Sequence, residues 1–361
     1  MGAVLMSFET LEDLEDTLVA LRVERSFALH LIETARPALS LKRHTTPDAE
    51  LPAGASKFGG DPDLPAHMPW PMRPPFPDAA ERQLALRQAA AYWEGRDDAC
   101  LRHEAAKILA TVPLVGEPFP LAFICQLDLT SLSQHGAFFH PLLPKHGRLL
   151  VFLDTVCWNG GAASDRGAMR VIWDQSPKEL LTRRAAPDPI MRWYEDFEAL
   201  RGAPKWNDRT SASFFEAKPV FTITHRWDDR FPEGHPRYEE FRDNYNKLRF
   251  SAPDRGFEWP GSGTEFGDQI GGWPSPLQHH PEEAAQLHFH GFEDDTHSSE
   301  ENELLEGATQ WQLVLSLTLE HWAETRILCN GRPDTELYVL MREEDLKARR
   351  FENAWMIEQS T

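Results

Sequence analysis

The densest group of side chains able to bind a metal lies in "LQHHPEEAAQLHFHGFEDDTHSSEENE", residues 277–303, where five histidines stand among acids. His288 and His290 are two residues apart, so on a strand both imidazoles would face one side and could bind zinc or nickel with a nearby carboxylate. The segment has no Cys partner and no HExxH spacing, and its acidic composition is typical of a solvated loop. A surface loop without a cofactor is the preferred interpretation, and a divalent metal at His288 and His290 is the alternative.

A second candidate is "THRWDDRF", residues 224–231, where His225 stands near Asp228 and Asp229. This set offers a general base with an orienting acid. The preferred interpretation is that the neighbouring arginines pair with these acids at the end of a strand. The chain contains no GxSxG elbow, GxGxxG turn, P-loop or SxxK motif, so acyl transfer, dinucleotide binding and phosphoryl transfer lack their usual signatures.

Two segments combine a Gly-Gly pair with nearby Trp and Pro: "SKFGGDPDLPAHMPWP" (56–71) and "DQIGGWPSPLQ" (268–278). Glycine accepts backbone conformations closed to other residues, so each pair predicts a tight corner against a sheet. As loops they are also candidate walls of a ligand cleft. Gln126 and Asp128 lie two residues apart on a predicted strand, so their side chains face the same side of it. They either polarise such a site or form a buried hydrogen-bonding pair. The cleft candidates are Gly59, Gly60, Trp70, Gln126, Asp128, Gly271, Gly272, Trp273 and Gln278.

The charge balance narrows the classes of partner. With 57 acidic and 37 basic residues the formal charge is −20, which opposes binding to nucleic acid or to anionic membranes and suits a basic protein partner. An acidic surface that only maintains solubility is the alternative. The longest apolar runs, such as "WQLVLSLTL", are shorter than the ~20 residues of a membrane span, so none is expected. The four cysteines show no CxxC spacing and predict reduced, buried thiols in a cytoplasmic protein.

The spacing of apolar residues along the chain predicts the helices and strands that position the candidate side chains. Apolar residues at helical spacing predict a helical hairpin or one long interrupted helix over residues 8–41. Pro and Gly then predict an ordered loop as far as residue 78. Residues 79–111 are rich in helix formers and predict an inserted helical segment. Strands are predicted at 121–129, 147–156, 168–174, 218–228 and 309–321, and helices at 188–202 and 236–250. This mixture indicates an α+β fold.

The end of the chain, "LYVLMREEDLKARRFENAWMIEQ", predicts a strand followed by a short helix with acids first and bases last. The spacing of Phe351 and Trp355 predicts that both aromatic side chains return to the core.

The order of segments repeats within the chain. A Gly-Gly loop, an apolar strand and a following strand occur as Gly59, "LAFICQL" and "GRLLVFLD", and again as Gly271, "LVLSLTL" and "TELYVLMR". This order predicts an ancient duplication in which two β-rich halves, at about 50–160 and 215–361, form one core. The expected organisation is an N-terminal helical extension over 1–45 and one domain over 46–361, with the helical insertion at about 78–112.

These segments resemble the YwqG-like proteins, a family of unknown function found mainly in bacteria. The resemblance rests on "SKFGGDPDLP", "PLAFICQLDL", "GRLLVFLD", "DQIGGWPSPLQ" and the C-terminal stretch, and it covers roughly residues 50–359. Members often carry Trp-Gly-Asp before the last strand, whereas this chain has "CNGRPDTELYVL", so a role for that motif does not carry over. The resemblance implies an α+β fold with a duplicated core and no established activity.

Two functional hypotheses follow. The first is a non-catalytic, acidic protein-binding module; since members of the resembled family occur in toxin-immunity neighbourhoods, its sharper form is an immunity-type protein that covers a basic bacterial toxin. The second is a small-ligand-binding protein or hydrolytic enzyme with a cleft between the halves, walled by the Gly-Gly loops. Polar side chains converging in a deep pocket would favour the second hypothesis, and a flat acidic face the first.

Overall fold

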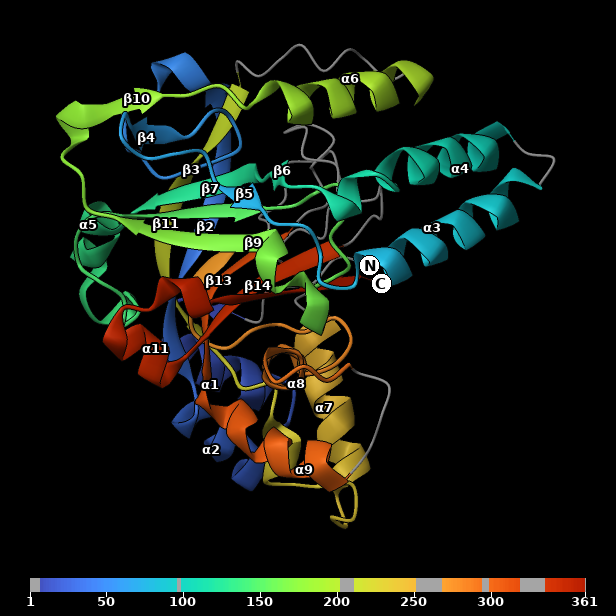
Figure 1. The fold of residues 1–361 in the computed structure, drawn as a ribbon. Helices are drawn as coiled ribbons and strands as arrows, with labels where there is room; N and C mark the ends of the chain where they lie inside the picture. The colour runs from blue at the N-terminus through green and yellow to red at the C-terminus, as the bar shows by residue number, and fades with distance from the viewer. Residues whose placement is uncertain are drawn as a thin grey trace.

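A computed structural model describes residues 7–95, 99–201, 211–250, 268–293, 299–318 and 335–360. Its main feature is an antiparallel sheet in the order β15-β14-β13-β12-β2-β11-β3-β7-β8-β9, with β1 added beside β11 (Figure 1). The strands of this sheet are β1 (Ser7–Phe8), β2 (Arg36–Pro47), β3 (Lys57–Phe58), β7 (Ala122–Asp128), β8 (Arg148–Leu153), β9 (Met169–Asp174), β11 (Ser211–Thr222), β12 (Gln269–Gly271), β13 (Trp311–Thr318), β14 (Thr335–Arg342) and β15 (Trp355–Ser360). Two small sheets pair β4 (Asp63–Pro65) with β10 (Leu181–Arg183), and β5 (Met72–Arg73) with β6 (Phe119–Pro120).

Several strands inside the sheet, among them β8, are buried on both faces. In β8, Leu149 and Val151 belong to the large core, whereas Leu150 and Phe152 belong to a smaller cluster on the other face. This period of two is that of a strand whose alternate side chains enter two different cores. Trp70 packs against the smaller cluster, so the Pro-rich segment after the first Gly-Gly pair covers the outer face of the sheet.

The longest strand pair, β2 with β11, lies at the centre of the sheet and runs without a break from Arg36 opposite Thr222 to Pro47 opposite Ser211. The predicted helical hairpin is therefore present only as far as residue 33, as α1 (Leu11–Ala20) and α2 (Arg25–Glu33). Residues 36–47 form a central strand instead, because Pro37 disfavours a continuing helix and residues 39–42 alternate between apolar and polar.

The two sides of the sheet pair in corresponding registers. Phe58 of β3 lies opposite Cys125, and Ile270 of β12 lies opposite Leu315. β7 and β13 each carry a register shift immediately before those partner residues. A Gly-Gly pair follows β3 and overlaps the end of β12, so each pair leaves the sheet at an equivalent position.

The two ends of the sheet meet around one core. A single apolar cluster includes side chains of β7, β8 and β9 together with those of β13, β14 and β15. At its edge the Trp355 Nε1 donates to the Gly161 carbonyl at 2.8 Å. Trp355 is 1% exposed and Phe351 is 3% exposed, which confirms that the C-terminal aromatic residues return to the core. The short C-terminal helix is α11 (Glu343–Ala348).

Helices cover the sheet and extend from it. The inserted segment is confirmed as helical, since α3 (Ala79–Glu94) and α4 (Ala99–Thr111) form a hairpin that projects from the body of the molecule (Figure 1). Beneath the sheet, α1, α2 and α7 (Tyr238–Phe250) share a second core rich in aromatic residues. The remaining α-helices described are α5 (Leu129–Leu132), α6 (Asp188–Arg201), α8 (Pro281–Phe289) and α9 (Ser299–Leu305). The α+β class is confirmed, and within the described ranges no helix is long and apolar enough to cross a membrane.

Candidate functional site

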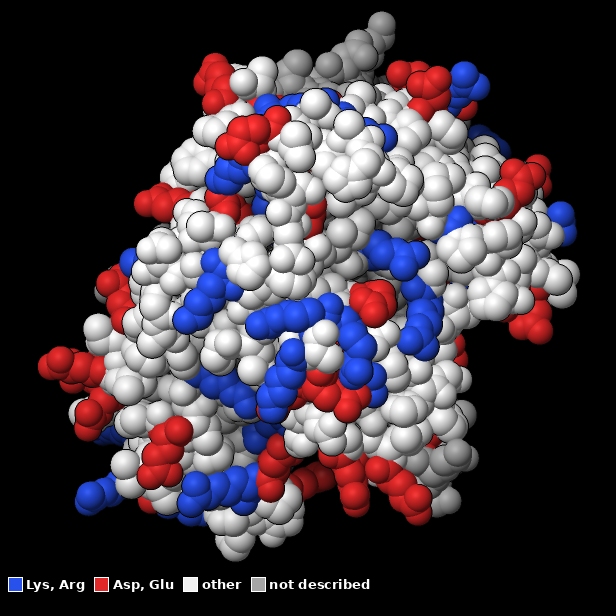
Figure 2. Space-filling model, turned by 60° about the vertical axis from the view of Figure 1, so that its left-hand side comes forward, with Lys and Arg blue, Asp and Glu red and all other residues white. Residues whose placement is uncertain are grey.

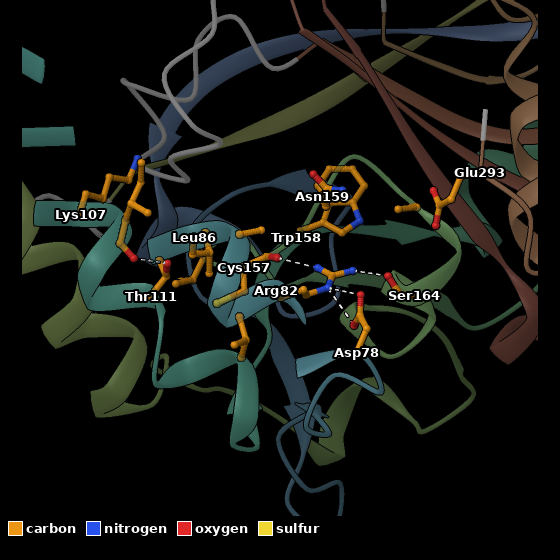
Figure 3. A pocket seen from close by; sticks show the side chains of 15 residues that line it. Asp78, Arg82, Leu86, Lys107, Thr111, Cys157, Trp158, Asn159, Ser164 and Glu293 are labelled. Carbon is orange, nitrogen blue, oxygen red and sulfur yellow. Dashed lines mark hydrogen bonds and ion pairs between the residues drawn. The ribbon is translucent and has the colours of Figure 1, made fainter. Parts of the chain in front are cut away.

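A cavity of about 530 Å³ lies between the inserted helices and the segment that follows β8 (Figure 3). The helices contribute apolar side chains, including Leu86 of α3 and Ile108 of α4, and residues 156–164 form the opposite wall. Glu293, which follows α8, reaches the cavity from the other half of the chain. The walls are therefore partly apolar and partly polar, as in sites for small organic molecules.

Arg82 ties α3 to the opposite wall. Its Nε lies 3.0 Å from both carboxylate oxygens of Asp78, and its Nη2 donates to Ser164 at 2.5 Å (Figure 3). The same Nη2 donates to Asp165 at 2.8 Å. Burial opposes the charged form, but the two carboxylates outweigh it and raise the pKa of Arg82. Because two carboxylates already neutralise its positive charge, Arg82 has a structural role in the cavity wall and does not require an anionic ligand.

Asp165 holds the loop on the other side of this ion pair. It is buried and accepts hydrogen bonds from the backbone N–H groups of Asn159 and Gly161, at 2.8 and 3.1 Å. Burial raises the pKa of Asp165 to about 6, against the opposing effects of Arg82 and the backbone donors. The carboxylate is therefore largely ionised at neutral pH and keeps the loop closed on α3.

Two neighbouring side chains, Cys157 and Trp158, limit the chemistry that the cavity can support. Burial and the adjacent Asp154 raise the pKa of the free Cys157 thiol, so it stays protonated and is a poor nucleophile. Trp158 is 7% exposed, and its Nε1 is buried without a hydrogen-bond partner in the described part of the chain. No histidine is among the residues that line the cavity, so a nucleophile–base pair is not assembled there.

None of the nine residues expected to line a cleft lines this cavity. Around the first Gly-Gly pair, Gly60 has φ +68°, and a Cβ on it would lie 2.7 Å from the carboxyl carbon of Asp48, so Gly59 and Gly60 turn a crowded corner. Gln126 is buried and donates to the Ala55 carbonyl and to Asp63, each at 2.8 Å. Its amide is thereby used within the fold.

The other cleft candidates also have partners in the structure. Asp128 caps α5 and pairs with Lys178 at 2.7 Å. The Trp70 Nε1 donates to the Leu121 carbonyl at 2.9 Å. Gln278 is exposed and donates to the Ser360 carbonyl at 2.7 Å. Gly271, Gly272 and Trp273 form a separate arrangement beside β2, which is described below.

The expected surface loop at 277–303 is wrong for residues 281–289, which form the buried helix α8. His288 is buried and its Nδ1 lies 2.7 Å from the Gly161 carbonyl, whereas His290 is exposed at the end of the helix. Residues two apart on a helix face different directions, so these imidazoles do not form one site. In the described residues no group of three or more His, Cys, Asp or Glu is arranged to hold a metal; His297 lies outside them.

The "THRWDDRF" segment also differs from the general-base hypothesis. The His225 Nε2 lies 3.1 Å from Glu282 of α8, and both side chains are buried. Arg226 pairs with Asp229 at 2.8 Å, as the preferred interpretation of this segment predicted. Sequence reasoning missed Glu282 because its partner is 57 residues away. It also missed Arg82 and Asp165, for which only the Arg-rich helix offered a signal.

Comparison with known proteins identifies a family but no function. No curated protein matches the chain. A family model described only as a domain of unknown function (DUF1963) matches residues 56–359, which include the cavity walls and both Gly-Gly loops. Because this match spans most of its length, the chain belongs to the DUF1963 family of unknown function.

Proposed function

We propose that the protein is a non-catalytic binding protein whose small ligand occupies the cavity between α3, α4 and residues 156–164. The observation that carries this proposal is the cavity itself, whose volume of about 530 Å³ falls within the range of small-molecule sites. Its apolar walls suit an organic molecule, and the inert Cys157 thiol argues against covalent chemistry.

The apolar part of the lining favours a ligand with an apolar body. Arg82 is already neutralised by Asp78 and Asp165, so it offers no unmatched charge to an anionic group. Lys107 and Glu293 are the other charged residues that line the cavity.

Cavity filling tests the proposal. Ala85 lines the cavity from an exposed position on α3, so Ala85→Trp should occupy the space without disturbing the core. Ala91 is exposed on the same helix and does not line the cavity, which makes Ala91→Trp the matched control. Native mass spectrometry and analysis of extracted small molecules should show a ligand in wild type and in Ala91→Trp that is lost in Ala85→Trp. An identical small-molecule content in all three proteins would reject the proposal.

A second candidate is the expected protein-binding role, in its immunity-type form. Exposed apolar side chains on the projecting hairpin favour it: Leu84 is 57% exposed, Tyr92 56% and Leu109 45%. The formal charge of −20 suits a basic toxin. Figure 2 shows one face on which Lys and Arg gather centrally with Asp and Glu around them, so on this face the acids do not form a continuous patch.

Substitutions on α3 distinguish the two proposed functions. For a toxin encoded beside this protein, binding measured by calorimetry should be lost in Leu84→Glu and retained in Ala85→Trp, because Leu84 is one of the exposed large apolar side chains and Ala85 is not. Equal affinity of wild type and Leu84→Glu would remove the hairpin from the interface.

We also propose that the two sides of the sheet derive from an ancient duplication and that the chain is a YwqG-like, bacterial member of its family. The matching registers of β3–β7 and β12–β13 support the duplication. The quoted motifs support the closer relationship. A cytoplasmic location is supported by Cys125 and Cys157, which are free thiols.

A further inference from the structure

The second Gly-Gly pair holds a tryptophan against β2. Gly271 and Gly272 have φ of +69° and +72°, a conformation that favours glycine. A Cβ on Gly272 would lie 2.5 Å from the Thr222 Oγ1 and 2.8 Å from the Ala38 Cβ, so no larger residue fits without a shift. The following Trp273 is therefore brought close to the central strand pair.

Trp273 is fixed in place by two hydrogen bonds. Its backbone N–H donates to the Thr222 Oγ1 at 2.8 Å, and its Nε1 donates to the Thr34 carbonyl at 2.8 Å. The guanidinium carbon of Arg36 lies 3.4 Å from the centre of the indole ring. Such stacking leaves the edge of the guanidinium group, which carries its N–H donors, free to bind another group.

Among the described residues, the Arg36 guanidinium has no counter-charge in contact. Among the described residues it makes no hydrogen bond and no ion pair, although the group is partly buried. Glu282 acts on it electrostatically, but that carboxylate is paired with His225 at 3.1 Å. Burial lowers the pKa of Arg36 and Glu282 only partly opposes this. A desolvated cation without a contacting partner is unfavourable and would be stabilised by an anion.

The first Gly-Gly pair provides an internal comparison. There the buried cation is Lys57, whose Nζ lies 2.6 Å from Asp48 and 2.6 Å from the Asp61 carbonyl. Asp63 adds a second carboxylate at 3.9 Å. Each Gly-Gly pair therefore lies near a buried or partly buried cation. Lys57, near the first pair, contacts carboxylates, whereas Arg36, near the second pair, contacts none among the described residues.

A neutral donor stands beside Arg36. The Nδ1 of His140 accepts from the Leu142 N–H at 3.2 Å, so in the neutral ring the Nε2 carries the hydrogen. Burial and the nearby Arg36 lower the pKa of His140 to about 4, so the ring is neutral at physiological pH. His140 also packs against Gly271, where a Cβ would lie 3.3 Å from that of His140.

We propose that Arg36, stacked on Trp273, binds the oxyanion group of a small ligand, either a carboxylate or a phosphate. The planar guanidinium offers two parallel N–H donors that match both groups, and such charge-assisted pairs are about twice as strong as neutral hydrogen bonds. The site is distinct from the cavity beside α3, because neither Arg36 nor Trp273 lines that cavity.

Calorimetric titration tests the site with two probes, sodium phosphate and sodium acetate, at constant ionic strength. We expect saturable binding of at least one anion, and the stronger of the two identifies the oxyanion class. Arg36→Met should weaken it about tenfold or more. The control is Arg242→Met: Arg242 also lies over an aromatic ring, that of Tyr238, but is exposed and paired with Glu239. Ala85→Trp should leave anion binding unchanged, which separates this site from the proposed ligand cavity.

A measurement on the wild-type chain covers the case in which Arg36→Met does not fold. Phenylglyoxal modifies accessible guanidinium groups, and peptide mapping reports each arginine separately. The bound anion should slow modification of Arg36 several-fold and leave Arg242 in the same sample unchanged. If neither anion binds saturably, if Arg36→Met binds as tightly as wild type, or if Arg36 is not protected, the proposal is wrong.

Discussion

Acid should destabilise this protein through His140, and the size of the effect follows from its surroundings. The ring is 7% exposed, lies near the Arg36 cation and accepts a backbone hydrogen bond at Nδ1. Burial first, and Arg36 second, lower its pKa from 6.5 to about 4. The folded state therefore binds this proton less readily than the unfolded state does. The stability contributed by neutral His140 is complete above about pH 6.5 and is lost as the pH falls toward 4.

The pKa difference sets the magnitude. From 6.5 to about 4, at about 1.36 kcal/mol for each pKa unit, the loss amounts to about 3 kcal/mol. A domain is stable by roughly 5–15 kcal/mol, so this single ring accounts for a substantial share of the acid sensitivity.

Substitution isolates the effect of His140 from that of the carboxylates. In His140→Asn the amide oxygen can accept from the Leu142 N–H as Nδ1 does, but the side chain does not titrate. Urea unfolding at about pH 7 and about pH 4.5 should show that the variant loses about 2–3 kcal/mol less on acidification than wild type. The control is His67→Asn at an exposed position. Equal acid sensitivity of wild type and His140→Asn would refute the reasoning.

Three further predictions concern the frame of the fold. A chain limited to the family match, residues 56–359, lacks β2 and should not unfold cooperatively on heating, because β2 pairs with both β11 and β12; a wild-type-like thermal transition would contradict this. A chain ending at Arg332 lacks β14 and β15 and should be insoluble or molten by near-UV circular dichroism; a cooperative unfolding transition near that of wild type would show that the tail is an appendage. Gly272→Ala should cost about 1–3 kcal/mol in urea unfolding and more than Gly291→Ala, which has positive φ but no close neighbour; equal costs would show that crowding is unimportant.

The sequence predicts those parts of the fold whose signal is local. β7, β8 and β14 have alternating or continuous apolar runs, and the Gly-Gly pairs predict the corners beside β3 and β12. The helical insertion follows from composition alone. In each case neighbouring residues carry the information, so a single sequence is enough.

What the sequence does not predict depends on distant partners. β2 is half polar, and its residues are predicted from sequence as the end of a helical segment and the start of a loop, because only β11 and β12 make it a central strand. α8 carries two glutamates and His288 and is nevertheless buried, because Glu282 pairs with His225 and His288 contacts Gly161. The cavity joins α3, α4, the segment after β8 and Glu293, which no local pattern connects.

The central pairing of β2 with β11 has a consequence for biosynthesis. Arg36 and Thr222 are 186 residues apart. At about 5–20 residues per second a ribosome needs roughly ten to forty seconds to make the intervening chain. During that time Leu39 and Leu41, which end fully buried, have neither neighbouring strand to cover them. The nascent protein therefore carries an unpaired strand edge through half of its translation, which makes it a natural client for a chaperone that binds extended apolar segments.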